Sequence, residues 1–435
     1  MQRVTESHLL GKTSSGRRMF FLITRRMPNL ARCSEWFSTT RSVSFYRPAL
    51  SRSVNSFFPS LDRLLPKHMN IYEKRLSRAR TSMNAHGLDA LILTPGAAMR
   101  YLTGFSEAGS RFLALIIPDD RPWLLVTPTL NAGQARENPA GIADIRVWDD
   151  AQGWDPLLMQ LSKELMLDIG IVGLDDDMPA RFALRLQEMM PTTLLKLAGT
   201  ALAPLRALKD ALELAALQHA AEATDALIPV AFAACREGES EMEIGLAIQL
   251  ATARAGFSDS FAPIIGAGAN GATPHHNTGK TRVRAGDVVI LDFGAMADGY
   301  HGDITRTVAV GAATDEAKYI YTVVHGAYLA GVAAVQPGAT AHDVDSAARQ
   351  VIVDAGFGEF FIHRTGHGIG LDDHEAPYML SGNYAPLLPG HCFSIEPGIY
   401  LPGKFGVRLE NIVTVTDDGT ARVLNEAIPP EIIVL

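Results

Sequence analysis

Short apolar runs alternate with helical repeats of apolar residues along the first half of the chain. Between residues 72 and 198 the runs have the length of buried strands and are separated by amphipathic segments. The expected elements are the strands Asp89–Leu93, Phe112–Ile117, Trp123–Val126, Ile169–Gly173 and Leu194–Leu197, and a helix over Pro156–Leu167. This alternation predicts an α/β domain. No cluster of chemically active side chains is visible in it.

A second domain is expected from about residue 201 onward. It opens with an Ala- and Leu-rich helical stretch that ends near Gly238. Ser240 and Glu243 then have the spacing of a capping box, which predicts the start of another helix. That helix is expected to stop at Gly256, because glycine favours the left-handed conformation that often follows a helix.

Hairpin-like strands alternate with further helices in the rest of the chain. These helices are expected over residues 315–335 and 343–355. The fold class is therefore α/β. The expected parts of the chain are a basic tail over residues 1–69, a first domain over 70–200 and a second domain over 201–435.

The first 69 residues differ from the remainder in charge. They contain 12 Lys and Arg against 3 Asp and Glu, whereas residues 70–435 contain 27 against 44. A basic, Ser-rich and acid-poor N-terminal segment is typical of a mitochondrial transit peptide. Met69 directly precedes the domain-like sequence, so upstream sequence translated from an early start codon is the favoured explanation of the segment. A nucleic-acid-binding arm is the third alternative, but the acidic remainder argues against nucleic acid as a partner.

Composition excludes several other kinds of protein. The apolar share of 47% supplies enough material for well-packed cores. The longest stretch without a charged residue, 319–342, contains Gln336 and breaks at Pro337–Gly338, so it predicts a buried helix and no membrane partner. The three cysteines are too widely spaced for a CxxC site. A cytoplasmic location is expected, with a mitochondrial one as the alternative if the tail is a targeting segment.

Carboxylates interrupt apolar strands in the second domain, and nine of the 13 histidines lie between His275 and His391. Asp292 and Asp303 stand on two consecutive strands. If the turn between these strands centres on Ala297 and Asp298, the two carboxylates face each other or lie one step apart. Like charges so placed repel each other, so we expect a cation between them. Two solvated residues at a sheet edge are the alternative.

A second hairpin repeats this arrangement of acids. Glu396 and Glu410 lie on strands that flank a Pro402–Gly403 turn, and His367 lies in a glycine-rich loop between the two hairpins. Four carboxylates and a neutral imidazole carry a charge that two divalent cations neutralise. Oxygen-rich ligation favours Mn²⁺, with Co²⁺, Fe²⁺ or Zn²⁺ as alternatives. Two neighbouring ions can activate water and polarise a carbonyl group, which predicts metal-assisted hydrolysis.

These motifs resemble the five-ligand signature of the pita-bread metallopeptidases. The matching residues are Asp292 in LDFG, Asp303 in HGD, His367 in TGHGIG, Glu396 in IEPG and Glu410 in VRLEN. The family includes Xaa-Pro dipeptidases (prolidases), Xaa-Pro aminopeptidases and methionine aminopeptidases. The resemblance extends over roughly residues 72–435. It implies a creatinase-like N-terminal α/β domain, a C-terminal pita-bread α+β domain and a homodimer. It also implies that Asp303 and Glu410 bridge two metals, with Asp292 on one and His367 and Glu396 on the other.

Three further residues resemble the Xaa-Pro branch of this family. His275 lies in TPHHN, His374 in DDHEAP, and Arg408 two residues before a metal ligand. By composition alone His276 is as plausible as His275. Asp373 departs from the family pattern, in which a small apolar residue commonly precedes the second histidine.

The resemblance also implies catalytic roles for these side chains. Glu396 is expected to accept a proton, His374 to stabilise the tetrahedral oxyanion and His275 to contact the leaving side of the substrate. Arg408 is expected to orient either a substrate carboxylate or the metal ligands. Outside this domain, Met99–Phe105 resembles a motif of the branch's N-terminal domain.

The predicted function is that of a metal-dependent exopeptidase that hydrolyses the Xaa-Pro bond of dipeptides and short peptides. A methionine aminopeptidase-like enzyme is one alternative, but the additional first domain and Arg408 count against it. A lyase or a peptide-binding relative on the same fold is another, and the intact set of ligands counts against both.

Overall fold

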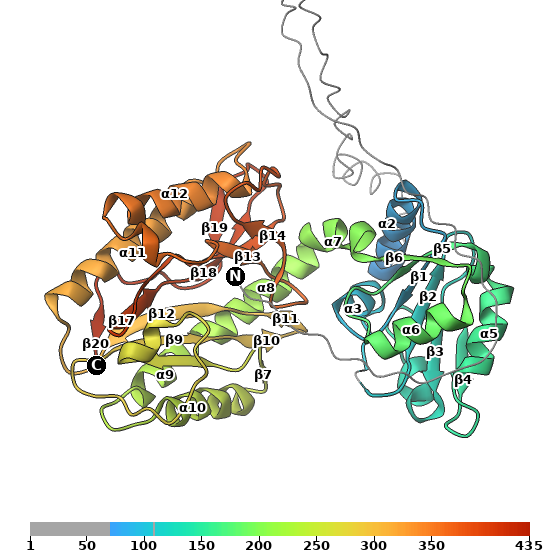
Figure 1. Cartoon of the computed structure of the whole chain (residues 1–435), viewed down its shortest axis with the longest axis horizontal. Helices are drawn as coiled ribbons and strands as arrows, with labels where there is room; N and C mark the ends of the chain where they lie inside the picture. Colours follow the sequence, from blue (N-terminus) through green and yellow to red (C-terminus); the bar gives the residue numbers. More distant parts are fainter. Residues whose placement is uncertain (1–69, 108) are drawn as a thin grey trace, which may run out of the picture. The chain divides into compact units, whose positions relative to one another are not determined.

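The computed structural model of the chain describes residues 70–107 and 109–435. The expected tail over residues 1–69 lies outside this part. The described chain forms two lobes in sequence order, each with its own sheets and core clusters (Figure 1). None of the described helices is long and apolar enough to cross a membrane.

The first lobe contains a six-stranded mixed sheet in the order β4-β3-β2-β1-β5-β6. Its strands are β1 (Ala90–Leu93), β2 (Ala114–Pro118), β3 (Leu124–Pro128), β4 (Ile145–Trp148), β5 (Ile171–Leu174) and β6 (Leu194–Leu197). β1, β2 and β3 are buried along their whole length, which explains their continuous apolar runs. All of the expected strands of this lobe are present, with small shifts at their ends.

Helices cover both faces of this sheet. They are α2 (Ile71–Ala85), α3 (Ala97–Thr103), α4 (Ala132–Arg136), α5 (Asp155–Glu164), α6 (Ala180–Met189) and α7 (Gly199–Ala207). α2, α3 and α7 pack with Leu91 on one face, whereas α5 and α6 pack with Ile92 on the other, because alternate strand residues point to opposite faces. Leu202 and Leu205 of α7 belong to this core, so the first lobe extends to Ala207, beyond the expected boundary at residue 200.

The second lobe is built from short sheets and longer helices. Its helices are α8 (Ala211–Asp225), α9 (Ile228–Ala234), α10 (Glu241–Arg254), α11 (Asp315–Ala333) and α12 (Ala341–Asp354). A four-stranded sheet has the order β20-β12-β9-β8, and a five-stranded sheet has the order β14-β13-β15-β18-β19. Its strands are β7 (Ser258–Asp259), β8 (Ile264–Ala267), β9 (Val288–Phe293), β10 (Ala295–Ala297), β11 (Tyr300–His301), β12 (Ile304–Ala309), β13 (Gly366–Gly368), β14 (Glu375–Met379), β15 (Cys392–Ile395), β16 (Gly398–Leu401), β17 (Phe405–Arg408), β18 (Asn411–Val415), β19 (Ala421–Val423) and β20 (Ile433–Val434).

Two groups of helices enclose these strands. α11 and α12 share a core with β15 to β18, whereas α9 and α10 share another with β8, β9 and β12 (Figure 1). The predicted capping box of Ser240 and Glu243 is present at the start of α10, and Gly256 follows that helix with a φ of +87°. The expected long Ala- and Leu-rich helix is divided into α8 and α9, and Pro229 stands in the first turn of α9.

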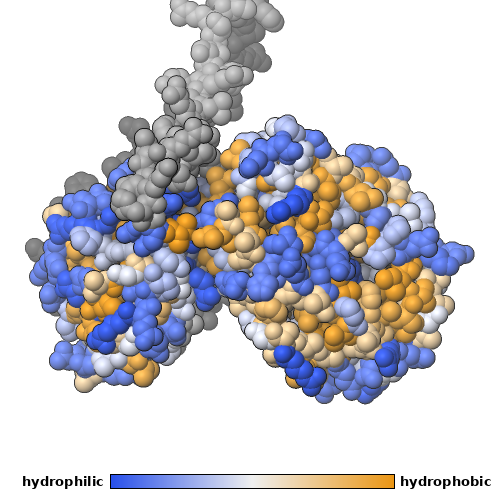
Figure 2. Space-filling view, turned by 180° about the vertical axis from the view of Figure 1, so that it is seen from behind, coloured by the Kyte–Doolittle hydropathy of each residue, from blue (hydrophilic) through white to orange (hydrophobic). Residues whose placement is uncertain are grey.

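Apolar side chains are also exposed on the second lobe. Figure 2 shows groups of hydrophobic residues between hydrophilic ones on the visible face of this lobe. On α10, Met242, Leu246 and Leu250 are exposed at a spacing of four residues, so they share one face of the helix.

The first acidic hairpin has a different register from the predicted one. Its turn centres on Asp298 and Gly299, which both have positive φ angles, as expected for an Asp-Gly hairpin turn. As a result Asp292 lies opposite Thr305 rather than opposite Asp303. Asp303 lies two residues from that position and therefore on the same face of the hairpin. The expectation that the two carboxylates lie close together survives this correction.

Gly294 explains why the hairpin can pass so close to its own backbone. A Cβ atom at this position would lie 1.8 Å from the carbonyl oxygen of Gly302. We expect Gly294→Ala to lower the melting temperature by several degrees, because a backbone atom has to move. Gly133→Ala is the control, since a Cβ there meets no atom within 4 Å and alanine favours a helix. Circular dichroism melting of both variants gives the comparison, and equal melting temperatures would contradict the prediction.

Candidate metal centre

One cavity of about 650 Å³ contains the eight side chains that the sequence assigned to the metal centre and to catalysis. These residues are His275, Asp292, Asp303, His367, His374, Glu396, Arg408 and Glu410. They come from segments spread over residues 275–410, and the second lobe supplies all of them. The cavity has the size of a typical small-molecule site.

The two acidic hairpins place their carboxylates by interrupting regular strand pairing. In the second hairpin, β15 and β18 pair as far as Ile395 and Asn411, and β16 and β17 resume the same register at Gly398 and Arg408. Glu396 and Glu410 stand opposite each other in the gap. Their backbone N–H groups donate instead to carbonyl oxygens of neighbouring segments, those of Thr365 and Thr305 respectively. The break in the ladder thus places both acids between consecutive strands and frees their side chains to face the cavity.

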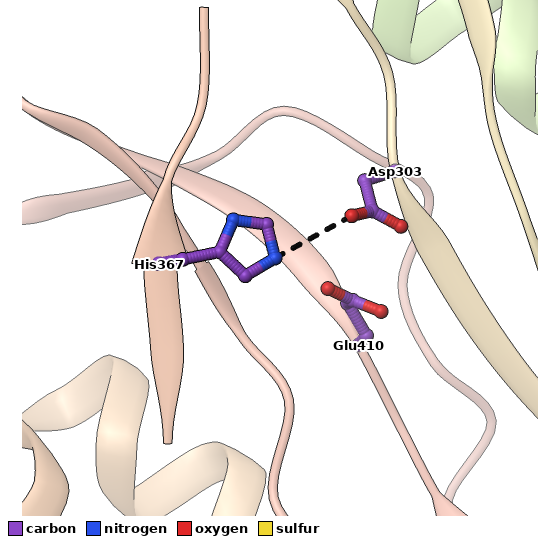
Figure 3. Close-up of side chains that lie close together, drawn as sticks. All are labelled: Asp303, His367 and Glu410. Atoms are coloured by element: carbon purple, nitrogen blue, oxygen red, sulfur yellow. Dashed lines mark ion pairs between the residues drawn. The ribbon is translucent and has the colours of Figure 1, made fainter. Parts of the chain in front are cut away.

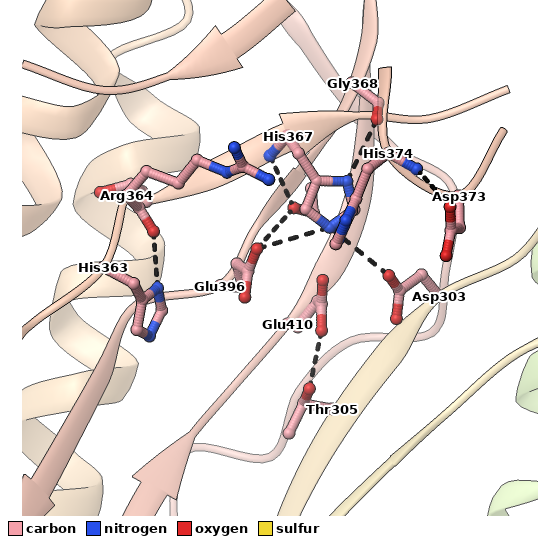
Figure 4. A network of polar contacts seen from close by, with 12 residues as sticks. Asp303, Thr305, His363, Arg364, His367, Gly368, Asp373, His374, Glu396 and Glu410 are labelled. Atoms are coloured by element: carbon pink, nitrogen blue, oxygen red, sulfur yellow. Dashed lines mark hydrogen bonds and ion pairs between the residues drawn. The ribbon is translucent and has the colours of Figure 1, made fainter. Parts of the chain in front are cut away.

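His367 points one ring nitrogen at the acids. Its Nδ1 lies 3.1 Å from the carbonyl oxygen of Gly368, so this nitrogen carries the proton and donates it. Its Nε2 lies 3.6 Å from Asp303 Oδ2 and 3.5 Å from Glu396 Oε1 (Figures 3 and 4). Burial lowers the pKa of His367 well below its ordinary value, so the imidazole is neutral. A neutral imidazole with a free nitrogen toward carboxylates is the form that binds a metal ion.

Burial also dominates the electrostatics of the carboxylates. It raises the pKa of Asp303 and of Glu396 well above the ordinary values, and the neighbouring acids raise both further. The pKa of Glu410 rises to about 7 through burial and repulsion by Asp292. Such groups are stable as anions only where positive charge compensates them.

The donor set fits divalent cations. Ligand atoms of Asp303, His367 and Glu410 lie within 4.8 Å of one another (Figure 3). Among the described residues, Asp292 Oδ1 and Asp303 Oδ1 are buried oxygens without a hydrogen-bond partner. Buried acceptors in folded proteins are normally satisfied, so these two oxygens are free for a metal ion.

Arg408 is buried beside Asp292 and makes an ion pair with it. Its remaining contacts run from Nε to the Thr305 hydroxyl and from Nη1 to the Tyr400 hydroxyl and the Pro274 carbonyl. A guanidinium has five N–H donors, and four of them are engaged in this way. Arg408 therefore holds a ligand in place and has one donor left.

His374 and Asp373 lie on the loop that follows β13. The ring of His374 contacts that of His367, with 3.7 Å between their centroids. Asp373 accepts a hydrogen bond from the His374 backbone N–H through Oδ1 at 2.9 Å (Figure 4). Asp373, the residue that departs from the family pattern, thus forms a hydrogen bond within its own loop. Burial lowers the pKa of His374, which the negative charge of Asp373 opposes.

Three further residues belong to this site and were not predicted from the sequence: His363, Arg364 and Tyr400. His363 and Arg364 line the cavity, and Tyr400 donates to His363 Nε2 at 2.8 Å. The Nδ1–H of His363 donates to the carbonyl oxygen of Arg364 at 2.7 Å, and burial lowers the pKa of His363 to about 3. His363 could have been found from its place four residues before His367. Nothing in the sequence marks Tyr400.

The structure separates the two adjacent histidines that the sequence left open. His275 lines the cavity, whereas the ring of His276 contacts Glu241. Only the first of them therefore faces the acids.

Comparison with known proteins agrees with this geometry. Residues 75–208 match the creatinase/prolidase N-terminal domain, and residues 215–417 match metallopeptidase family M24. A probable dipeptidase, PepE, of Mycobacterium tuberculosis is 38% identical over 367 residues, which cover 84% of this chain and 97% of that protein. An Xaa-Pro dipeptidase of Lactobacillus delbrueckii subsp. lactis is 33% identical over 348 residues, 79% of this chain and 95% of that protein.

A solved structure shows the same fold. The crystal structure of recombinant prolidase from Thermococcus sibiricus matches with a TM-score of 0.80 at 35% identity, covering 84% of this chain and 100% of that one. The fold and the buried acids thus define a metal-dependent peptidase of the pita-bread type. The chain belongs to metallopeptidase family M24, in the prolidase branch that carries the creatinase-type N-terminal domain. The predicted fold class, family and hydrolase class are confirmed.

Removal of single acids tests the metal centre directly. We expect Asp303→Asn and Glu410→Gln to lose most of the bound metal, since each removes a buried negative charge between the other ligands. Elemental analysis of the purified variants measures this. Glu359→Gln, which changes an exposed carboxylate outside the cavity, is the control and should retain the metal content of the unmodified protein. Unchanged metal content in Asp303→Asn and Glu410→Gln would refute the assignment.

Proposed function

We propose that this protein is a dinuclear exopeptidase that hydrolyses the Xaa-Pro bond of dipeptides and short peptides. The observation that carries the proposal is the convergence of four carboxylates and His367 on one cavity. Their charge matches two divalent cations, and the oxygen-rich set favours Mn²⁺ over softer ions. Relatives named Xaa-Pro dipeptidase support the substrate class.

The metal ions supply Lewis acidity and an activated water molecule when they are bound. The protein's own groups then divide the remaining work. Glu396 lines the cavity beside His367, and we assign to it the role of accepting the proton of the attacking water. His374 stabilises the oxyanion that develops on the scissile carbonyl. His275 also lines the cavity and contacts the leaving group of the substrate.

Two polar networks hold these groups in position. Thr305 Oγ1 donates to Glu410 Oε2 at 2.7 Å and accepts from Arg408 Nε at 3.0 Å. The Tyr400 hydroxyl lies between Arg408 and His363, and so connects the ligand set to the wall of the cavity. Side chains fixed in this way lose little entropy when a substrate is aligned.

The charged groups of the cavity favour dipeptides as substrates. A dipeptide presents its α-carboxylate one residue beyond the scissile bond, so a dipeptidase needs a donor of positive charge at that distance. We assign this role to the remaining N–H of Arg408 together with His275, which both line the cavity. An amide or a longer peptide replaces the carboxylate with a neutral group. A homodimer is proposed on the resemblance to the family.

The alternatives predict different substrates. A methionine aminopeptidase cleaves after an N-terminal methionine, whether or not proline follows it. A lyase or a binding protein hydrolyses neither Xaa-Pro nor Met-Xaa peptides. We expect the protein to hydrolyse Ala-Pro and Leu-Pro and to spare Met-Ala. Chelation should abolish the hydrolysis, and Mn²⁺ or Co²⁺ should restore it. Hydrolysis of Met-Ala alone, or full activity of protein shown by elemental analysis to be metal-free, would refute the proposal.

The dipeptide preference has its own test. A charged hydrogen bond typically stabilises by about 1.5–3 kcal/mol, so we expect kcat/KM for Ala-Pro to exceed that for its amide and for Ala-Pro-Ala by about 10-fold or more. Arg408→Lys should narrow this gap, because lysine lacks the planar arrangement of donors. Steady-state kinetics at saturating Mn²⁺ measures both effects. An equal loss for all three substrates would mean that Arg408 serves the metal ligands alone.

A further inference from the structure

The loop that carries His275 is held on both sides of this residue. On one side, the carbonyl oxygen of Pro274 accepts a hydrogen bond from Arg408 Nη1 at 3.3 Å. On the other side, Nε2 of His276 lies 2.8 Å from Oε2 of Glu241. His275 stands between these two contacts and faces the cavity.

Glu241 is an unusual residue for its position. It is the first residue of α10 and is completely buried. A buried carboxylate is costly unless hydrogen bonds and positive charge compensate it. The N-terminus of α10 supplies a favourable dipole, and the segment around the loop supplies the hydrogen bonds.

The Glu241 carboxylate collects four donors from this segment. Oε1 accepts from the Ala267 N–H at 3.0 Å and from Asn270 Nδ2 at 2.8 Å. Oε2 accepts from the Gly279 N–H at 3.0 Å as well as from the His276 ring. One carboxylate therefore binds the strand before the loop, the start of the loop and its end.

The His276 contact differs from the other three in its effect. Backbone donors and Asn270 fix the two ends of the loop whatever residue stands at 276. The ring of His276 fixes the residue next to His275. His276 is turned toward Glu241, while the adjoining side chain of His275 lines the cavity.

We propose that His276 and Glu241 are positioning residues for the reaction, which hold the backbone at 275–276 so that the His275 imidazole faces the substrate. The inference rests on the proposed function, because it requires that His275 contacts the substrate. A displacement of a reacting or orienting group by about 1 Å can reduce a rate by about 100-fold. His276 therefore affects turnover through His275 and not through metal binding.

A double-mutant cycle tests this coupling. We expect His276→Ala to lower kcat for Ala-Pro by about 10-fold or more while metal content and KM change little. His276→Gln, which keeps a donor, should recover part of the rate. In a His275→Ala background, His276→Ala should cost less than about 2-fold, because the side chain that it positions is already absent.

His219→Ala is the matched control. Its ring also lies 2.8 Å from a carboxylate, that of Asp298, but at an exposed place outside the cavity. This variant should turn over Ala-Pro at the rate of the unmodified protein. If His276→Ala does not fold, His276→Leu keeps the volume of the side chain without its donor and completes the same cycle.

Two results would overturn the inference. One is an unchanged kcat in the His276 variants, and the other is the same fold-loss with and without His275. Failure of the proposed function is seen separately, as an unmodified protein that does not hydrolyse Ala-Pro. The cycle is then measured on whichever peptide the unmodified protein cleaves, where coupling between His275 and His276 is still expected.

Discussion

Four carboxylates buried in one cavity repel each other, and the second lobe is organised around this constraint. In water such charges separate, whereas here Asp292, Asp303, Glu396 and Glu410 are fixed on two hairpins. The pKa values of all four are raised, with burial as the largest cause. Arg408 pairs with Asp292, and the repulsion among the acids favours the binding of further positive charge. Metal binding and the integrity of this region are therefore coupled.

The central strand β12 shows how the lobe holds these mutually repelling carboxylates in place. Successive side chains of β12 point to opposite faces of the sheet. On one face, Thr305 binds the side chain of Arg408 and Thr307 binds its backbone. On the other face, Arg306 binds the backbone of Glu410 and the side chain of Asn411. The charged groups of the cavity wall are thus fixed by neighbours on a strand. Sites on strands keep their geometry better than sites on loops, and this explains why the loop of His275 needs the additional anchor of Glu241.

Much of this arrangement could be predicted from the sequence. A charged residue in or next to an apolar strand is costly, and that cost marks Asp292, Asp303, Glu396 and Glu410 as candidate functional residues. The strands of the first lobe and the capping box of α10 follow from periodicity and capping chemistry. All of these signals are local in the sequence.

The parts that could not be predicted depend on contacts between distant segments. The register of the first hairpin is an exception, because Asp298-Gly299 is a favoured hairpin turn and this local signal alone gives the observed pairing. The Tyr400 hydroxyl contacts His363 and Arg408 only because β16 pairs with β17 and lies beside the segment that precedes β13. By its sequence, Glu241 is an ordinary residue in the first turn of a helix. Burial and long-range packing, which a single sequence does not reveal, give these residues their roles.

Anomalous diffraction from crystals of the Mn²⁺-loaded protein tests the central claim most directly. We expect two manganese peaks in the cavity, both bordered by Asp303 and Glu410, with Asp292 beside one of them and His367 and Glu396 beside the other. A single peak, or peaks away from these carboxylates, would contradict the claim that the four buried acids exist to hold a pair of cations.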